Sequence, residues 1–303
     1  MEATERLLAL KPKYTELLGS NGALKLVGLF AEIELGKYKK EEVHLVELKG
    51  VKHPFYIRSI RADMQSFLNT FIDGYLEKKA YLSEPEYIID TGANIGYTAI
   101  LFANWCPNAK IIGIEPDKEN YEFALKNTAN YPNITILNAG LWNKTTRLKI
   151  EAGQEDGFVV KEIAKNEVSI NPENLTTAIS IKEILETYRF PRIDFLKMNI
   201  EGSEKEVFSE GYEIWLPKTK AMLIELHDGK NSGCSKAVFG ATSLYDFAVA
   251  ETAPYGVLFV KEPIYRKWYA QWYKEEIYNP NINKDRFPSF YLDKEQEKIV
   301  KEN

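Results

Sequence analysis

The chain has 303 residues, of which 45% are hydrophobic, 27% charged and 13% aromatic. This composition is typical of a globular protein with a substantial hydrophobic core, and it excludes disorder and collagen-like repetition. The formal net charge is −5, whereas a dedicated nucleic-acid binder usually carries a basic excess. We therefore expect no nucleic acid as a main partner.

The cysteines and the first residues indicate the compartment. Cys106 and Cys234 are the only cysteines, and neither has the nearby Cys or His that a zinc site or a redox pair requires. The start of the chain carries acids where a signal peptide carries basic residues. The longest apolar region, 22–35, is interrupted by charges, whereas a membrane span needs roughly 20 apolar residues. We expect reduced, buried thiols, no membrane span and a cytoplasmic location.

The first part of the chain, residues 1–84, predicts a cap that lies against a larger domain. It contains a helical stretch, a hairpin-like segment at 43–60 and a helix near 64–76.

Between residues 85 and 262, short β-rich apolar runs alternate with helical patterns, which is typical of a parallel sheet with crossover helices. The predicted strands cover 87–90, 110–115, 133–138, 193–199, 221–226 and 256–260. The predicted helices cover 95–105, 118–128 and 181–188, and another follows residue 199. Asp117 is placed to cap the second helix, Ser180 and Glu183 have the capping-box spacing, and Gly211 is the expected C-cap of the last helix. The pattern predicts an α/β core.

The remaining residues, 263–303, form a strongly aromatic C-terminal extension. Its rings predict packing against the domain or against a second copy in a homodimer. The alternative is a lid that stacks on sugar rings. The aromatic residues of this extension are Tyr265, Trp268, Tyr269, Trp272, Tyr273, Tyr278, Phe287, Phe290 and Tyr291.

The most informative segment is the loop 90–96, which directly follows a predicted strand and precedes a predicted helix. Its small residues let the backbone turn sharply and approach a ligand, and Asn94 tolerates left-handed backbone angles. Ligands of open α/β sheets bind at the carboxyl ends of the strands. The loop therefore predicts a binding site.

Spacing narrows the choice of ligand. A dinucleotide fingerprint, Gly-x-Gly-x-x-Gly, counted from Gly92 would need glycine where Asn94 and Tyr97 stand. An NAD-linked reductase therefore remains only as a weaker alternative. Glu115 ends the second predicted strand and is placed to accept hydrogen bonds from ribose hydroxyls, a feature that NAD enzymes share. It supports an adenosine ligand of either kind.

Four segments taken together resemble the FkbM family of methyltransferases. They are Asp90-Thr91-Gly92-Ala93-Asn94-Ile95-Gly96-Tyr97, Ile114-Glu115-Pro116, the block from Asp194 to Glu204 with Leu-Lys-x-x-x-Glu-Gly-x-Glu, and Glu225-Leu226-His227. The resemblance implies a Rossmann-like class I methyltransferase fold, with a mostly parallel seven-stranded sheet and helices on both faces. It also implies S-adenosylmethionine as the methyl donor and a hydroxyl on a sugar, a glycan or a small natural product as the acceptor.

The same resemblance suggests roles for the cofactor residues. We expect Glu115 to bind the ribose and Asn138 to lie near the adenine. The methionine part is assigned to Asp90, Gly92, Ala93, Asn94 and Gly96.

Three residues are the catalytic candidates. His227 has the pKa range needed to remove a proton from a hydroxyl, and Glu201 is expected to face the cleft. The family usually has Asp where this chain has Asn199, and asparagine keeps a hydrogen-bonding carbonyl but loses the charge. Glu225, Glu201, Asn199 and His227 could also surround a divalent ion that lowers the pKa of the acceptor hydroxyl, but no metal is predicted, because no ligand spacing is recognisable. Because of Asn199 and the aromatic C-terminal extension, a cofactor-binding interaction protein that has lost catalysis is an alternative to the enzyme.

Overall fold

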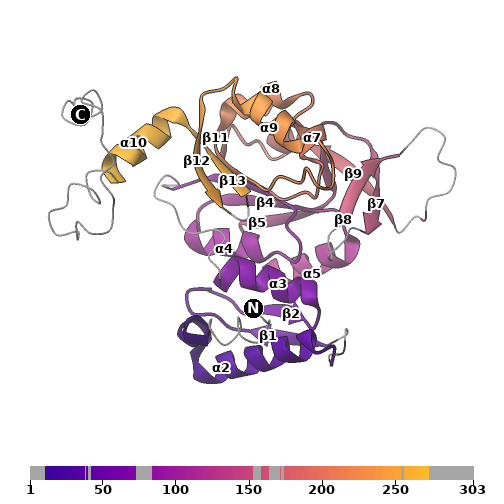
Figure 1. Cartoon of the computed structure of the whole chain (residues 1–303), viewed down its shortest axis with the longest axis vertical. Helices are drawn as coiled ribbons and strands as arrows, with labels where there is room; N and C mark the ends of the chain where they lie inside the picture. Colours follow the sequence, from indigo (N-terminus) through magenta and orange to yellow (C-terminus); the bar gives the residue numbers. More distant parts are fainter. Residues whose placement is uncertain are drawn as a thin grey trace.

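The computed structural model of the chain describes residues 11–37, 39, 42–72, 84–152, 158–163, 171, 174–253 and 256–272. Its first elements form a small unit at the bottom of Figure 1. In chain order these are α2 (Lys11–Glu34), β1 (Val43–Val46), β2 (Phe55–Arg58), α3 (Arg61–Phe67) and the π-helix η1 (Leu68–Ile72). The strands β1 and β2 pair antiparallel, which confirms the predicted hairpin. The predicted helix near 64–76 begins at Arg61, and its residues 73–76 lie outside the described residues.

The core is a seven-stranded sheet in the order β12-β13-β11-β10-β3-β4-β5. Its strands are β3 (Tyr87–Thr91), β4 (Lys110–Glu115), β5 (Ile134–Asn138), β10 (Ile193–Met198), β11 (Thr219–Ile224), β12 (Phe247–Ala253) and β13 (Gly256–Lys261). The five from β5 to β11 are parallel, and β13 runs antiparallel between β11 and β12. The predicted mostly parallel, Rossmann-like sheet is therefore confirmed. The chain order reverses between β3 and β10, where a crevice opens at the carboxyl ends.

Two apolar layers cover the sheet because successive side chains of a strand point to opposite faces. Ile88 and Ile111 belong to one layer, and their neighbours Ile89 and Ile112 belong to the other. The first layer includes α4 (Tyr97–Trp105), α5 (Lys118–Thr128) and the N-terminal unit. The second layer includes α6 (Ile181–Thr187), α7 (Glu204–Val207), α8 (Tyr212–Trp215), η3 (Leu216–Lys218) and α9 (Cys234–Thr242). The predicted helices on both faces of the sheet are therefore confirmed.

A four-stranded sheet, which the sequence analysis did not predict, is inserted between β5 and α6. Its order is β6-β9-β7-β8, and it lies at the right of Figure 1. Its own apolar cluster is small and includes Trp142, Leu148 and Val160. Its strands are β6 (Gly140–Trp142), β7 (Arg147–Ala152), β8 (Phe158–Glu162) and β9 (Leu175–Ser180).

Two predicted features of the core need correction. The helix after β10 ends at Val207, where Ser209 Oγ donates to the Glu206 carbonyl. Side chains that bond the backbone in this way compete with helix continuation. Gly211 is therefore not its C-cap; it has φ 76° and directly precedes α8. No disulfide joins the two cysteines; Cys234 is buried as expected, but Cys106, directly after the last residue of α4, is only half-buried.

Both predicted N-terminal helix caps are confirmed. The Asp117 side chain accepts a hydrogen bond from the Asn120 N–H at the start of α5. Ser180 and Glu183 form a reciprocal capping box at the start of α6.

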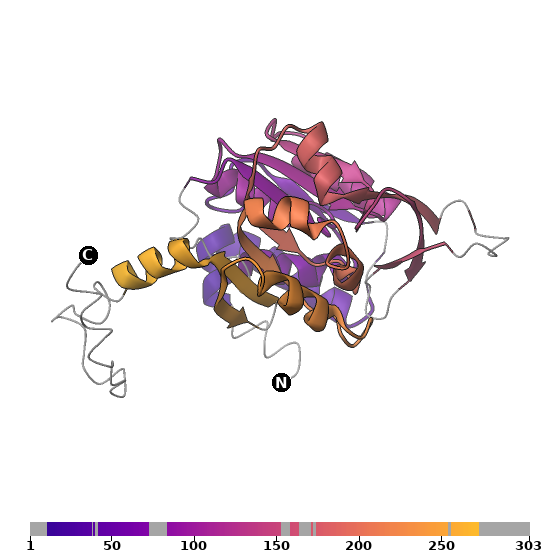
Figure 2. The same cartoon turned by 90° about the horizontal axis from the view of Figure 1, so that it is seen from above.

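Helix α10 (Glu262–Trp272) projects from one end of the sheet in both Figure 1 and Figure 2. It carries Tyr265, Trp268, Tyr269 and Trp272 of the aromatic extension; the other predicted rings lie outside the described residues. Within the described part of the chain, no helix combines the length and apolarity needed to cross a membrane. The divisions of the chain after residues 84 and 262 stay predictions.

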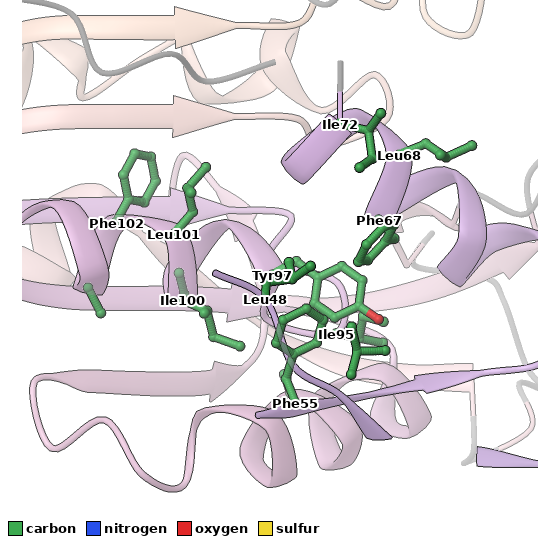
Figure 3. Close-up of a cluster of buried hydrophobic side chains, with 14 of the residues drawn as sticks. Leu48, Phe55, Phe67, Leu68, Ile72, Ile95, Tyr97, Ile100, Leu101 and Phe102 are labelled. Atoms are coloured by element: carbon green, nitrogen blue, oxygen red, sulfur yellow. The ribbon is translucent and has the colours of Figure 1, made fainter. Parts of the chain in front are cut away.

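Aromatic packing joins the N-terminal unit to α4, the helix that follows the glycine loop. Figure 3 shows Phe55, Phe67 and Tyr97 converging between the two. The rings of Phe55 and Tyr97 lie 5.0 Å apart, edge to face, a geometry that stabilises aromatic pairs. The Tyr97 hydroxyl donates to the carbonyl of Tyr56 at 3.0 Å. The cap and the core are thus packed as one body at this point.

A buried arginine makes the second connection. Arg58 donates to both carboxylate oxygens of Asp63, at 2.7 and 2.9 Å, and the Asp63 side chain has no exposed surface. The same guanidinium donates to Asn120 Oδ1 at 2.7 Å and to Glu119 at 3.1 Å. Because Asn120 lies on α5, this network ties the cap to the edge of the predicted site.

We expect Arg58→Lys to lower the free energy of unfolding by about 1–3 kcal/mol, because an ammonium cannot donate the paired bonds that a guanidinium makes to a carboxylate. Urea unfolding monitored by circular dichroism measures the free energy of unfolding of the variant and of the wild type. Arg61→Lys is the matched control, because that side chain is 59% exposed in its pair with Glu34. Equal losses in the two variants would contradict the expectation.

Candidate functional site

The loop after β3 adopts the tight turn that its small residues predict. Gly92, Asn94 and Gly96 have φ values of 74°, 48° and 90°, in the left-handed region that glycine and asparagine tolerate. The N–H groups of Gly92 and Ala93 both donate to the carbonyl of Ile114, at 3.0 and 2.9 Å. The loop is therefore held against the end of β4.

Gly92 is needed because two strand ends meet there. A Cβ atom on Gly92 would lie 1.8 Å from the carbonyl oxygen of Asn199. The Asn199 N–H in turn donates to the carbonyl of Thr91 at 3.1 Å. The glycine therefore allows the end of β3 to touch the end of β10.

Glu115 lies beside this loop as a buried carboxylate. One of its oxygens accepts from the Asn94 N–H at 2.8 Å and the other from the Asp117 N–H at 3.0 Å. Burial raises the pKa of Glu115 to about 7, although both hydrogen bonds act to lower it. Each carboxylate oxygen has a second lone pair, so the group can still accept hydrogen bonds from a ligand.

Asp90 lies behind the loop. Its side chain is fully buried, 3.2 Å from Lys197 Nζ, and it accepts from the Thr98 hydroxyl. Lys197 Nζ also donates to the carbonyl of Gly92 at 2.8 Å. Sequence reasoning missed the role of Lys197, although a lysine inside a buried strand was a signal. The ion pair of Asp90 and Lys197 therefore holds the backbone of the loop in place from the buried side.

A cavity opens at the carboxyl ends of β3, β4 and β10. Five predicted site residues line it: Gly92, Asn94, Glu115, Asn199 and Glu201. The lining also includes residues that sequence reasoning missed, namely Asn120 on α5 and Gly140, Leu141, Phe158 and Val160 on the inserted sheet. No local motif marked the last four, because the inserted sheet itself was not predicted.

The other predicted residues lie around this cavity without lining it. Ala93 and Gly96 lie in the loop, with Gly96 at the start of α4. The Asn138 amide donates to the carbonyls of Glu115 and Pro116, at 3.0 and 3.1 Å, and so fixes the turn that follows β4.

His227 follows β11 and lies among three carboxylates. Its Nδ1 atom is 2.7 Å from Glu204 Oε1, and its Nε2 atom is 3.9 Å from Glu201 Oε2 and 3.7 Å from Glu225 Oε1. Burial by itself lowers the pKa of His227, but the hydrogen bond and charge of Glu204, with the charges of Glu201 and Glu225, raise it above its ordinary value. Lys230 pairs with Glu201. Sequence reasoning did not assign Glu204 to the site.

Asn199 contacts the same cluster through its amide, which donates to Glu225 Oε2 at 2.7 Å. Burial raises the pKa of Glu225, and so do the nearby charges of Glu201 and Glu204. Among the residues that the structure describes, no three His, Cys, Asp or Glu side chains are grouped as metal ligands would be.

A family model described as the methyltransferase FkbM domain matches residues 90–248, more than half of the chain. This chain belongs to the FkbM methyltransferase family. S-adenosylmethionine is therefore its cofactor, and the matched region spans the loop, Glu115, Asn199 and His227.

Solved methyltransferase structures resemble this member of the family more distantly. A fibrillarin/Nop5p complex has 15% identity and a TM-score of 0.35, with 58% of this chain and 72% of that chain covered. A putative caffeoyl-CoA O-methyltransferase from Staphylococcus aureus has 13% identity and a TM-score of 0.36, covering 58% and 76%. Aeropyrum pernix fibrillarin with natively bound S-adenosyl-L-methionine has 11% identity and a TM-score of 0.35, covering 64% and 73%. No curated protein sequence matches the chain.

The side chains at the cavity fit this cofactor. Two carboxylates, Glu115 and Glu201, line it, and no Lys or Arg is among its described lining residues. Such a set suits a sulfonium with ribose hydroxyls better than a phosphate, which needs cationic or N–H donors. The Oδ1 atom of Asn199 is buried without a hydrogen-bond partner in the described residues. It could accept a hydrogen bond from the ammonium group of the methionine part of S-adenosylmethionine.

We expect the affinity for S-adenosylmethionine to fall about tenfold from about pH 8 to about pH 6, because the predicted ribose contact needs the ionised form of Glu115, whose pKa is about 7. Isothermal titration calorimetry measures it. Without the cofactor, the free energy of unfolding should change with pH in the opposite direction to the affinity. Folding raises the pKa of Glu115, so this carboxyl stabilises the fold most below its unfolded pKa of 4.5, and the stabilisation is lost as the pH rises through about 7. Glu115→Gln should bind more weakly and lose the pH dependence; an unchanged slope in that variant would contradict the assignment.

Proposed function

We propose that this protein methylates a hydroxyl oxygen on a sugar, a glycan or a small natural product. The observation that carries the proposal is the position of His227, whose Nε2 atom lies 3.9 Å from Glu201, a residue of the cavity wall. A hydroxyl acceptor must lose its proton, and imidazole is the side chain best suited to take it near neutral pH. The phenyl ring of Phe158 beside polar Asn199 and Glu201 also suits a sugar, which has apolar and hydroxyl faces.

The proposed reaction needs few protein groups. When bound, S-adenosylmethionine supplies an electrophilic methyl group, whose bond to sulfur breaks as the bond to the acceptor oxygen forms. The chain holds the acceptor in line, which in favourable intramolecular models contributes about 7–11 kcal/mol. His227 Nε2 takes the hydroxyl proton, and Glu201 and Glu225 stabilise the imidazolium that results.

Asn199 has a binding role in this proposal. Its neutral amide cannot act as a general base, but it donates to Glu225 and so orients a carboxylate of the site. Aspartate at this position would place a second carboxylate within 2.7 Å of Glu225, and like charges at that distance resist joint ionisation. This contact supports an active enzyme over the alternative of an interaction protein without catalysis.

Two measurements test the proposal. Thermal melting with and without S-adenosylmethionine or S-adenosylhomocysteine tests binding, because a ligand specific to the native state stabilises it. Mass spectrometry after incubation with glycans and small hydroxylated metabolites tests transfer, with addition of one methyl group as the expected result. Binding without transfer to any hydroxyl, but with transfer by Asn199→Asp, would favour the non-catalytic alternative. The cytoplasmic location and a homodimer stay predictions.

A further inference from the structure

A carboxylate on the first turn of a helix normally lies in water, but Glu204 does not. Its side chain has no exposed surface, although it begins the short helix α7. Oε1 lies 2.7 Å from His227 Nδ1 and 3.4 Å from the Gly202 N–H, and Oε2 is buried with no hydrogen-bond partner in the described residues. Burial of a carboxylate is costly unless it is paired. A role in complementing the helix dipole does not require this burial.

The surroundings of Glu204 leave His227 to pair with it. Among the ion pairs of the described residues, Glu204 has His227 as its partner, whereas Lys230 pairs with Glu201. The thiol of Cys234 closes the other side of Glu204; burial, the charge of Glu204 and a hydrogen bond with its carboxylate raise the pKa of this thiol to about 12, so the thiol stays neutral. Glu204 is thus a carboxylate sealed from water and directed at one nitrogen of an imidazole.

Strained backbone brings Glu204 to this position. Glu201 and Gly202 have φ values of 58° and 106°, two successive residues in the left-handed region that is unfavourable for a glutamate. The turn directs the start of α7 toward the residues that follow β11. Non-glycine residues held in this region cluster at functional sites.

We propose that Glu204 is a positioning residue: it holds the proton of neutral His227 on Nδ1, so that Nε2 presents a lone pair to the acceptor hydroxyl. The inference rests on the proposed function and deepens it. Within the described chain, Nε2 makes no hydrogen bond, since Glu201 and Glu225 lie 3.9 and 3.7 Å away. In the transfer, the hydroxyl proton moves to Nε2, and Glu204 stabilises the imidazolium through Nδ1–H. A carboxylate that orients a histidine in this way fixes the tautomer without taking the proton.

The tautomer and the titration of His227 test this directly, without an acceptor. The chain has three histidines, so the His227 ring signals can be assigned by comparison with His227→Asn. In the full-length protein, nitrogen-15 NMR should show the Nδ1–H tautomer at high pH. In Glu204→Gln the His227 pKa should fall by about one pH unit or more, because a charge within hydrogen-bond distance favours the imidazolium.

Two further variants keep the test decisive. Glu206→Gln is the matched control, because Glu206 lies on the same helix and faces Asn231 instead of His227; its His227 titration should match the wild type. Glu201→Gln and Glu225→Gln measure the contributions of the two more distant carboxylates, which should be smaller. If Glu204→Gln does not fold, Glu204→Asp, which withdraws the carboxylate by one methylene, serves instead. An Nε2–H tautomer in the wild type, or an unchanged His227 titration in the Glu204 variant, would overturn the inference.

The activity of the same variants separates this inference from the proposed function. With a methylated acceptor identified, Glu204→Gln should lower kcat about 10²–10⁴-fold, the range for loss of an oriented general base. The KM for S-adenosylmethionine should change little, and the acidic limb of the pH profile should move to lower pH. Absence of S-adenosylmethionine binding in the wild type would defeat the proposed function but leave the NMR result standing.

Discussion

Gly92→Ala is expected to lower the free energy of unfolding by about 2–5 kcal/mol and to abolish binding of S-adenosylmethionine. The added methyl group would lie 1.8 Å from the Asn199 carbonyl oxygen, which belongs to backbone and has no flexible side chain to move aside. Alanine at φ 74° also carries a cost of about 1–2 kcal/mol for its left-handed conformation. Overpacking between two strand ends adds about 1–3 kcal/mol or more. Urea unfolding and calorimetry measure the two effects.

Gly240→Ala is the matched control for this prediction. Gly240 lies on α9, and a Cβ there would meet no atom within 4 Å. Alanine in an exposed helix should raise stability by about 0.5–1 kcal/mol. A Gly92→Ala protein that binds the cofactor like the wild type would show that the ends of β3 and β10 do not need their contact.

His227→Asn is expected to lower kcat for methyl transfer about 10²–10⁴-fold, the usual contribution of a general base. The variant loses the proton acceptor beside the cavity, yet Glu115 and the glycine loop are untouched. The dissociation constant for S-adenosylmethionine should therefore change by less than about threefold, because only the transition-state interaction is removed. Single-turnover mass spectrometry and calorimetry separate the two quantities.

The control for His227 comes from the cap. His53 lies at the N-terminal unit, where its ring packs edge-on against Tyr131, and His53→Asn should keep full turnover. Full turnover in His227→Asn would remove this residue from the mechanism and direct attention to Glu201 as the base.

The fold could be predicted to a large extent because its signals are local. The alternation of Ile88 with Ile89 and of Ile111 with Ile112 divides one sheet between two layers, and a two-residue period needs no knowledge of distant contacts. The caps at Asp117 and Ser180 depend on groups within three residues. The inserted sheet was missed because its strands, such as Arg147–Ala152 with Arg, Lys and Glu, lack a long apolar run.

The sequence by itself determined the glycine loop, the acid after β4 and the alternating core, since these depend on backbone freedom and periodicity at neighbouring positions. Only the tertiary structure decided which side chains meet. Asp90 pairs with Lys197 from another strand, Phe158 reaches the cavity from the inserted sheet, and Glu204 lies against His227. Each of these contacts joins residues separated by more than twenty positions, and the distance between them is set by packing of whole elements, which no local pattern encodes.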